Sequence, residues 1–236
     1  MIINAGSKPL NILLIGSGRL AHHLQFWVSL STEKIHLSTW DRHQDPQRIR
    51  TLVQSADLIW LAISDQAITP FYEKYIEGSD IPTVHFSGAY HDARILSCHP
   101  LMTFGNELYE DTVYNQIAFA ITGSEHLKDM MPGFDNRYFV LSPELKPLYH
   151  ALCVVCGNFP QLLWNESSKI SQQHQIPFKY FEQLIQFSLK NFMQQGSLAL
   201  TGPIARKDLP TIEKNQKALP APLKSIYASF EKEFLK

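Results

Sequence analysis

A glycine-rich turn close to the start of the chain constrains the fold more than any other feature. Residues 16–21 read GSGRLA and follow the compact apolar run 10–15, which predicts a buried strand. Residues 19–30 then carry apolar side chains at helical spacing. The order is therefore strand, glycine turn and helix, which is typical of the first unit of a doubly wound α/β fold.

The residue types in this turn suit a bound pyrophosphate. Gly16 permits a tight turn, Gly18 lets the backbone approach a phosphate, and Ala21 lets the helix pack closely against the strand. Amide groups at the start of the helix then face the phosphates, whose charge the helix dipole favours. An ordinary glycine-rich connection is the alternative explanation. We expect a nicotinamide dinucleotide to contact Gly16, Ser17, Gly18, Arg19 and Leu20.

The residues after the second predicted strand bear on the choice of nucleotide. Asp41 comes 23 residues after Gly18, where a carboxylate accepts hydrogen bonds from the ribose of NAD. Arg42 follows directly, and a guanidinium there stacks on adenine or meets the 2'-phosphate of NADP. NAD and NADP therefore remain equal alternatives, and a solvated surface charge is a further explanation for Arg42.

Apolar runs and helical stretches alternate along the first 142 residues. The expected strands are 35–40, 58–63, 83–86, 95–98 and, last, 117–121. The expected helices between them are 47–55 and 68–76. This alternation predicts an α/β fold with a mostly parallel sheet that is covered by helices on both faces.

From residue 143 on, the short apolar runs typical of strands stop, and apolar residues recur at helical spacing instead. The apolar residues Leu148, Leu152, Val155, Phe159 and Leu162 are the first to show this spacing. We therefore expect a nucleotide-binding domain at 1–142 and an all-helical domain at 143–236.

Polar and small residues follow two of the predicted strands. Ser64 and Asp65 come after the run 58–63, and Ser87 and Gly88 come after the next strand. Ligands of doubly wound sheets lie beyond the carboxyl ends of the strands, so we expect these four residues beside the cofactor. A helix cap is the alternative role for Asp65.

The composition excludes several classes of partner. Lys and Arg number 21 and Asp and Glu 22, so the formal net charge is -1, and no bulk attraction to nucleic acid or anionic lipid follows. The longest apolar runs are far short of the roughly 20 residues that cross a bilayer. Polar residues interrupt the amino-terminal segment, which predicts no secretory signal there.

The cysteines and histidines indicate a compartment and argue against a metal site. Three cysteines cannot all pair, which predicts a reducing, cytoplasmic compartment. Cys153 and Cys156 have a redox spacing but lie in an apolar helical run, so we expect buried, inert thiols. The ten histidines show no metal-ligand spacing with carboxylates or cysteines, and we expect no metal.

Short motifs occur in a fixed order over nearly the whole chain. They are GSGRLA at 16–21, ADLI at 56–59 with Ser64-Asp65, HFSGA at 85–89, CHPLMTF at 98–104, GNF at 157–159 and ALTGPIARKD at 199–208. In this order they resemble the Rossmann-like proteins with a DUF2520 domain. The relatives of that family are pyrroline-5-carboxylate reductase, deazaflavin-dependent NADP oxidoreductases and the 6-phosphogluconate dehydrogenase superfamily. The resemblance implies an NAD(P)-binding domain, a helical domain that often mediates homodimerisation, and an active site in the cleft between them.

Two positions depart from the patterns of these relatives. The family tends to have Gly between the Arg and the Asp of the last motif, where this chain has Lys207, so we expect a different backbone or an extra charge. Hydroxyacid dehydrogenases of the superfamily place a catalytic Lys four residues before an Asn. Here Val154 stands four residues before Asn158, which argues against a hydroxyacid mechanism.

His99 and Asn158 are the candidates for the chemical step. An ordinary histidine pKa near 6.5 suits proton transfer at neutral pH, and a structural role at a strand end is the alternative for His99. Asn158 lies in a helix disturbed by Gly157 and Pro160, where an unpaired amide is costly. We expect it to bind substrate or the nicotinamide carboxamide, or else to cap a kink.

A break between helices supplies the candidates for substrate binding: Thr201, Gly202, Arg206 and Asp208. Arg206 clamps a carboxylate with two hydrogen bonds, or it contacts Asp208 at the surface. The sequence thus predicts an NAD(P)-dependent oxidoreductase that acts on a small imine, carbonyl or hydroxy compound. A dinucleotide-binding sensor or regulatory protein without turnover is the alternative.

Overall fold

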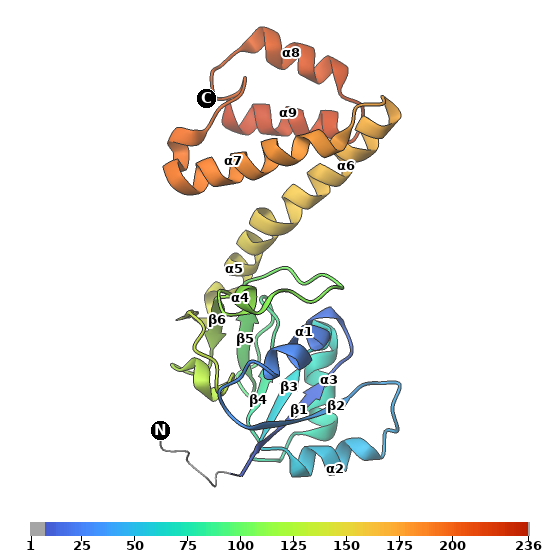
Figure 1. Cartoon of the computed structure of the whole chain (residues 1–236), viewed down its shortest axis with the longest axis vertical. Helices are drawn as coiled ribbons and strands as arrows, with labels where there is room; N and C mark the ends of the chain where they lie inside the picture. Colours follow the sequence, from blue (N-terminus) through green and yellow to red (C-terminus); the bar gives the residue numbers. More distant parts are fainter. Residues whose placement is uncertain (1–7, 236) are drawn as a thin grey trace. The chain divides into compact units, whose positions relative to one another are not determined.

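The structure, a computed structural model, describes residues 8–235. The chain divides into two compact units, Met1–Val154 and Val155–Lys236, twelve residues after the change of texture expected after residue 142 (Figure 1). Residues 1–7, which bear on the expectation of no secretory signal, lie outside the described part. Across residues 8–235, no helix is both long and apolar enough to cross a membrane.

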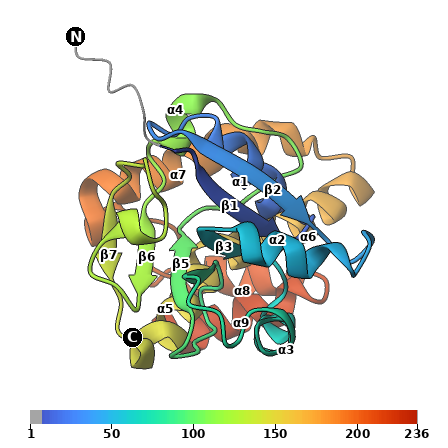
Figure 2. The same ribbon diagram turned by 90° about the horizontal axis from the view of Figure 1, so that it is seen from below.

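A seven-stranded sheet forms the centre of the first unit, with the strand order β2-β1-β3-β4-β5-β6-β7. The strands are β1 Leu10–Ile15, β2 Ile35–Trp40, β3 Leu58–Leu61, β4 Thr83–His85, β5 Leu96–Pro100, β6 Phe119–Thr122 and β7 Tyr138–Val140. All neighbours run parallel except β5 and β6, which are antiparallel. Figure 2 shows β2 and β7 at the two edges. The expected mostly parallel sheet is confirmed.

Helices cover both faces of this sheet because successive strand residues point to opposite sides. The helices are α1 Arg19–Val28, α2 Arg48–Ser55, α3 Asp65–Tyr75, α4 Asp111–Tyr114 and α5 Lys146–Cys153. Ile12 and Leu14 of β1 belong to the core that includes the buried face of α1. Leu13 and Ile15 belong to a second core, which α2 and α3 complete. A strand buried on both sides explains the unbroken apolar run of β1.

The expectation that the last strand is 117–121 is wrong, because β6 is followed by β7. Strand β7 pairs in parallel with β6 alone and forms the edge of the sheet. Its three residues, Tyr138, Phe139 and Val140, are all exposed. Such a short edge strand, exposed on both faces, gives no alternation of buried and exposed residues to detect.

The second unit is helical, as expected. Its helices are α6 Phe159–Gln173, α7 Glu182–Gln195, α8 Leu209–Ala218 and α9 Leu223–Phe234. Helix α9 packs against α8 and α6. Asn215 of α8 donates a hydrogen bond to the Tyr227 hydroxyl of α9 at 3.2 Å. Among the described residues of this unit, Ile212 is the only apolar side chain that is fully buried.

Candidate functional site

A cavity of about 840 Å³ lies at the carboxyl ends of β1, β2 and β3. Nine of the residues that the sequence predicts at the cofactor line it together with the strand ends: Gly16, Ser17, Gly18, Arg19, Leu20, Asp41, Arg42, Ser64 and Asp65. Ser87 also lines it, from the segment after β4. A pocket at this edge of a parallel sheet is where doubly wound folds bind their ligands.

The turn between β1 and α1 has the geometry that a bound phosphate needs. Gly16 has a φ of +126°, and a Cβ there would lie 2.2 Å from the Ala62 carbonyl oxygen, so only glycine fits. Around Gly18, by contrast, a Cβ would meet nothing within 4 Å. Helix α1 begins at Arg19 with no side-chain cap on its first amides. These amides are therefore free to bind an anion at the mouth of the cavity.

Asp41 and Arg42 stand at the end of β2, on the cavity wall. The Asp41 carboxylate accepts a hydrogen bond from the His43 amide at 2.8 Å, which fixes one oxygen and leaves the other free. Arg42 is exposed and forms no salt bridge with the carboxylates of residues 8–235. Both side chains are therefore available to a ligand.

Ser87 connects the cavity wall to helix α3. Its hydroxyl donates a hydrogen bond to Asp65 at 2.8 Å and accepts one from the Tyr90 amide at 2.9 Å. Asp65 is the first residue of α3, and Ser64 stands at the N-cap position without a side-chain cap bond. Asp65 thus holds the segment after β4 in place, which is a different role from the helix cap considered for it.

Gly88 lies beside the cavity wall but is buried against two histidine rings. A Cβ on Gly88 would lie 3.0 Å from His99 Nε2 and 2.8 Å from His150 Cδ2. The absent side chain therefore lets both rings approach the backbone. In the parallel strands β4 and β5, His85 is paired with Ser97. Two residues further along each strand, His99 and Ser87 therefore lie at the same end of the sheet.

His99 has a hydrogen-bond partner that the sequence did not reveal. Its Nδ1 lies 2.7 Å from the Tyr149 hydroxyl of α5. Burial, together with the positive charge of Lys146 and the nearby His150, lowers the pKa of His99 to about 4. The ring is therefore neutral at pH 7, and the ordinary histidine pKa assumed in the sequence analysis does not apply.

Lys146, on the first turn of α5, is a second residue that sequence analysis missed. Its side chain is buried, and Nζ donates hydrogen bonds to Ser97 Oγ at 2.6 Å and to the Ser87 carbonyl oxygen at 3.1 Å. Burial lowers the pKa of Lys146 to about 8, against the opposing effects of Asp65 and Cys98. The ammonium group thus ties α5 to the segment that lines the cavity.

His85, at the end of β4, is a further buried polar side chain, close to Lys146 and His99. Its Nδ1 accepts a hydrogen bond from the Ser87 amide at 3.2 Å, so its proton is on Nε2. That nitrogen is buried and has no partner among the described residues. Burial, together with the charges of Lys146 and His91, lowers the pKa of His85 to about 3.

A family model described as a domain of unknown function, DUF2520, matches residues 117–233. The chain is a DUF2520 domain-containing protein. The resemblance found in the sequence motifs is confirmed. A search among curated proteins finds no match to the chain.

Solved structures with the same fold as the DUF2520 protein include three with informative names. One is a protein of Bacteroides fragilis provisionally described as an NADP oxidoreductase, with a TM-score of 0.77, 19% identity and coverage of 96% of this chain and 98% of that one. Another is the reductive aminase of Aspergillus terreus in complex with NADPH and ethyl levulinate (0.62; 11%; 96% and 95%). The third is 1-pyrroline-5-carboxylate reductase of Streptococcus pyogenes (0.60; 15%; 97% and 99%).

The helical unit of the DUF2520 protein carries Asn158 at the end of a π-helical segment, Val154–Asn158. Asn158 is exposed, so its amide is open to solvent or to a ligand. The expected burial of the two thiols on this helix is wrong, since Cys153 is half-buried and Cys156 exposed. π-helical turns are frequent at functional sites.

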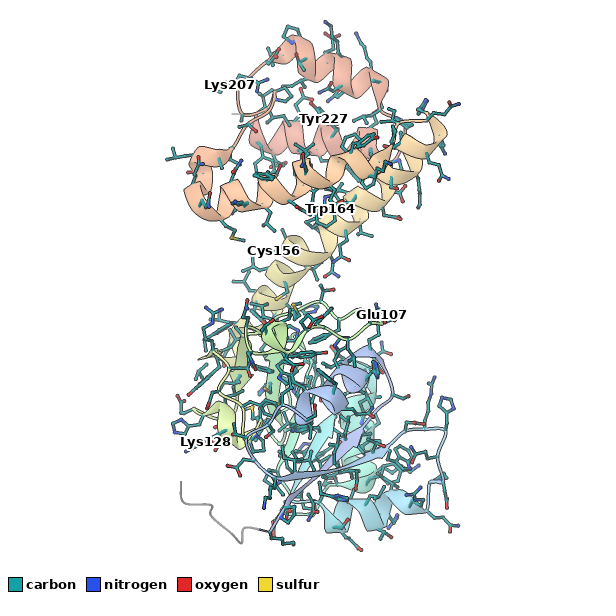
Figure 3. The ribbon with its side chains drawn as sticks, viewed as in Figure 1. Glu107, Lys128, Cys156, Trp164, Lys207 and Tyr227 are labelled. Atoms are coloured by element: carbon teal, nitrogen blue, oxygen red, sulfur yellow. The ribbon has the colours of Figure 1, made fainter. Side chains whose placement is uncertain are left out.

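Thr201, Gly202, Arg206 and Asp208 lie before α8, in the same unit. Asp208 accepts a hydrogen bond from the Thr211 amide at 3.2 Å and so caps α8, while Arg206 is exposed. Lys207 between them has a left-handed φ of 56°. Figure 3 shows Lys207 and Cys156 at opposite ends of this unit.

Proposed function

We propose that the protein is an oxidoreductase that transfers a hydride between a nicotinamide dinucleotide and a small imine, carbonyl or hydroxy compound. The observation that carries the proposal is the turn at Gly16 and Gly18. One glycine is required by the fold, and the other leaves open space beside uncapped helix amides. That pair of properties suits a pyrophosphate and has no use in an ordinary connection.

The residues that would hold the dinucleotide follow from the cavity lining. The amides at Gly18 and Arg19 would bind the pyrophosphate, and Asp41 or Arg42 the adenosine end. Ser87, tied to Asp65 and Lys146, would position the other half. The nicotinamide supplies the redox chemistry, while the protein supplies binding, orientation and a hydrogen-bonding partner for the substrate. The names of the structural neighbours, which include NADPH complexes, support this assignment.

Each unit by itself offers candidates for the substrate side. In the first unit the candidate is His99. In the helical unit the candidates are Asn158, Thr201, Gly202, Arg206 and Asp208. The exposed guanidinium of Arg206 is free to bind a carboxylate. A sensor without turnover remains the second candidate, and the exposure of Asn158, without a lysine four residues before it, favours it.

Turnover separates the two candidates. We expect the absorbance of reduced nicotinamide to fall when the protein is mixed with NADPH or NADH and a panel of cyclic imines, ketones and aldehydes. Saturable binding of the nucleotide without loss of absorbance over the whole panel would favour the sensor. No binding of either nucleotide would overturn both candidates.

The helical unit also supports a proposal about assembly, a homodimer through this half of the chain. Its large apolar side chains are mostly exposed, for example Leu184, Phe187 and Phe192 on α7. Apolar patches of this kind are rare on monomeric proteins and mark interfaces. A second copy offers the same apolar surface and would cover it.

A further inference from the structure

Helix α5 has its polarity reversed relative to an ordinary surface helix. Lys146, Tyr149 and His150 are directed toward the sheet, at spacings that place them on one side of the helix. Leu148 and Leu152, on the other side, are more than half exposed. Burying polar groups beneath apolar ones is costly, so the inward side of α5 calls for an explanation beyond packing.

The two ring nitrogens of His99 lie in different surroundings. Nδ1 is held by the Tyr149 hydroxyl at 2.7 Å. Nε2 lies beside Gly88, and no hydrogen bond to it is found within residues 8–235. A phenol is a better donor than acceptor, and the two groups beside the Tyr149 hydroxyl are His99 Nδ1 at 2.7 Å and the Cys153 thiol. Sulfur is a weak acceptor, so His99 Nδ1 is the stronger acceptor for the phenol proton. The arrangement that satisfies both groups is therefore Tyr149 donating to Nδ1, with the ring proton on Nε2.

We propose that Tyr149 is a positioning residue that fixes the tautomer of His99, so that Nε2 carries the proton and donates a hydrogen bond to the substrate. This inference rests on the proposed function for the existence of a substrate, and on geometry for the tautomer. His99 then acts as a neutral donor that polarises a carbonyl oxygen or an imine nitrogen during hydride transfer. His99 keeps its proton, and the reduced product takes its proton from solvent water.

The groups that face His99 keep its ring neutral. They are Lys146, Tyr149 and His150 from α5 and His85 from β4. Burial disfavours a cation at His99, and the charges of Lys146 and His150 add to this effect, which is why the pKa of His99 falls to about 4. Burial also raises the pKa of Tyr149, so its hydroxyl keeps the proton that it donates to Nδ1.

A fixed Nε2 proton narrows the class of substrate. The reacting atom must accept a hydrogen bond, as a carbonyl oxygen, an alcohol oxygen or a neutral imine nitrogen does. A protonated iminium would place its own N–H against the donor and is disfavoured. Among the compounds considered for this protein, carbonyl compounds and their alcohols fit the site best.

Nuclear magnetic resonance of the ¹⁵N-labelled full chain tests the proposal without any substrate. Two-bond correlations of the imidazole ring show which nitrogen is protonated, and the signal of His99 is identified by its loss in His99→Gln. Between about pH 5 and 8 we expect a neutral ring with the proton on Nε2. A proton on Nδ1, or an imidazolium at pH 7, in the wild-type protein overturns the proposal.

The variant Tyr149→Phe removes only the hydroxyl and supplies the second readout. Loss of one hydrogen bond should shift the ratio of the two tautomers by at least about fivefold toward the Nδ1 form. The exposed Tyr180 provides the matched control, and Tyr180→Phe should leave the ratio unchanged. An unchanged ratio in Tyr149→Phe contradicts the proposal. Calorimetry with NADPH on the same samples reports separately whether the proposed function fails.

Discussion

Lys207 has a backbone conformation that residues with a side chain rarely adopt. The resemblance to the family, taken to have Gly here, suggested either a changed backbone or an extra charge at this position. The structure shows a left-handed φ of 56°, a conformation that favours glycine, with a lysine held in it. The conformation costs a residue with a side chain about 1 kcal/mol or more.

Replacing Lys207 by Gly is therefore expected to stabilise the protein. We predict that Lys207→Gly raises the free energy of unfolding by roughly 0.5–1 kcal/mol, measured by denaturant titration. The control Lys214→Gly changes the same residue type in the interior of α8, where glycine costs about 1 kcal/mol, so it should destabilise. Equal destabilisation by both changes would show that position 207 is not left-handed.

We predict that Asp41 and Arg42 determine the preference between NADH and NADPH. Arg42→Ala should lower the affinity for NADPH about tenfold and that for NADH much less, because only NADPH carries the 2'-phosphate. Asp41→Ala should weaken NADH more, through loss of the ribose contact. Parallel calorimetric titrations of both nucleotides into each variant measure this. Equal losses for both nucleotides would remove these residues from the recognition of the ribose.

At the scale of elements, sequence patterns located the residues directly after a strand and missed those that pack across the sheet. Strands β1 and β3 are buried runs, and chain order alone places the residues after them at the cavity. Helix α5 was predicted from its leucine stripe alone, Leu148 and Leu152, which lies on the exposed side. Lys146, Tyr149 and His150, opposite that stripe, were a detectable signal. Their contacts depend on tertiary packing, which periodicity does not predict.

The lowered pKa values of His85 and His99 predict how the free energy of unfolding depends on pH. In the unfolded chain histidines bind protons near pH 6.5, whereas the folded pKa values are about 4 for His99 and about 3 for His85. Between these pH values the unfolded chain binds more protons than the folded protein. The contribution of these histidines to the free energy of unfolding is therefore complete above about pH 6.5 and decreases as the pH falls. The loss is at most about 1.4 kcal/mol per pH unit for each histidine.

Denaturant titrations at pH 7 and pH 5 measure this loss. In His85→Gln the difference between the two pH values should shrink, because one of the two groups no longer titrates. His36→Gln alters an exposed histidine and should leave the difference as in the wild type. Equal stability of the wild-type protein at both pH values would show that these histidines are not kept neutral by folding.

At the scale of the whole molecule, the two units differ in how they bury apolar surface. The first has two cores, one on each face of its sheet. The helical unit has almost none, as its described residues bury a single large apolar side chain, Ile212. Helical periodicity predicted the helices correctly, but it does not tell whether an apolar stripe meets the same chain or another copy.

A homodimer should therefore depend on the apolar residues of α7. By sedimentation at micromolar concentration we expect a mass of twice 27.0 kDa for the wild-type protein. Leu184→Glu should shift the protein toward the monomer, while Lys190→Glu, which puts the same charge on the same helix, should not. A wild-type monomer, or equal effects of the two changes, would rule out this interface.

The account depends most directly on the space beside Gly18. A Cβ there meets nothing within 4 Å and φ is -75°, so Gly18→Val should fold with unchanged thermal stability. Its side chain would occupy the place of the pyrophosphate, and calorimetry should show NADPH affinity reduced by about tenfold or more. Gly157→Ala, also into open space but in the helical unit, should bind as the wild type does. A folded Gly18→Val variant that binds NADPH as tightly as the wild type would contradict the account.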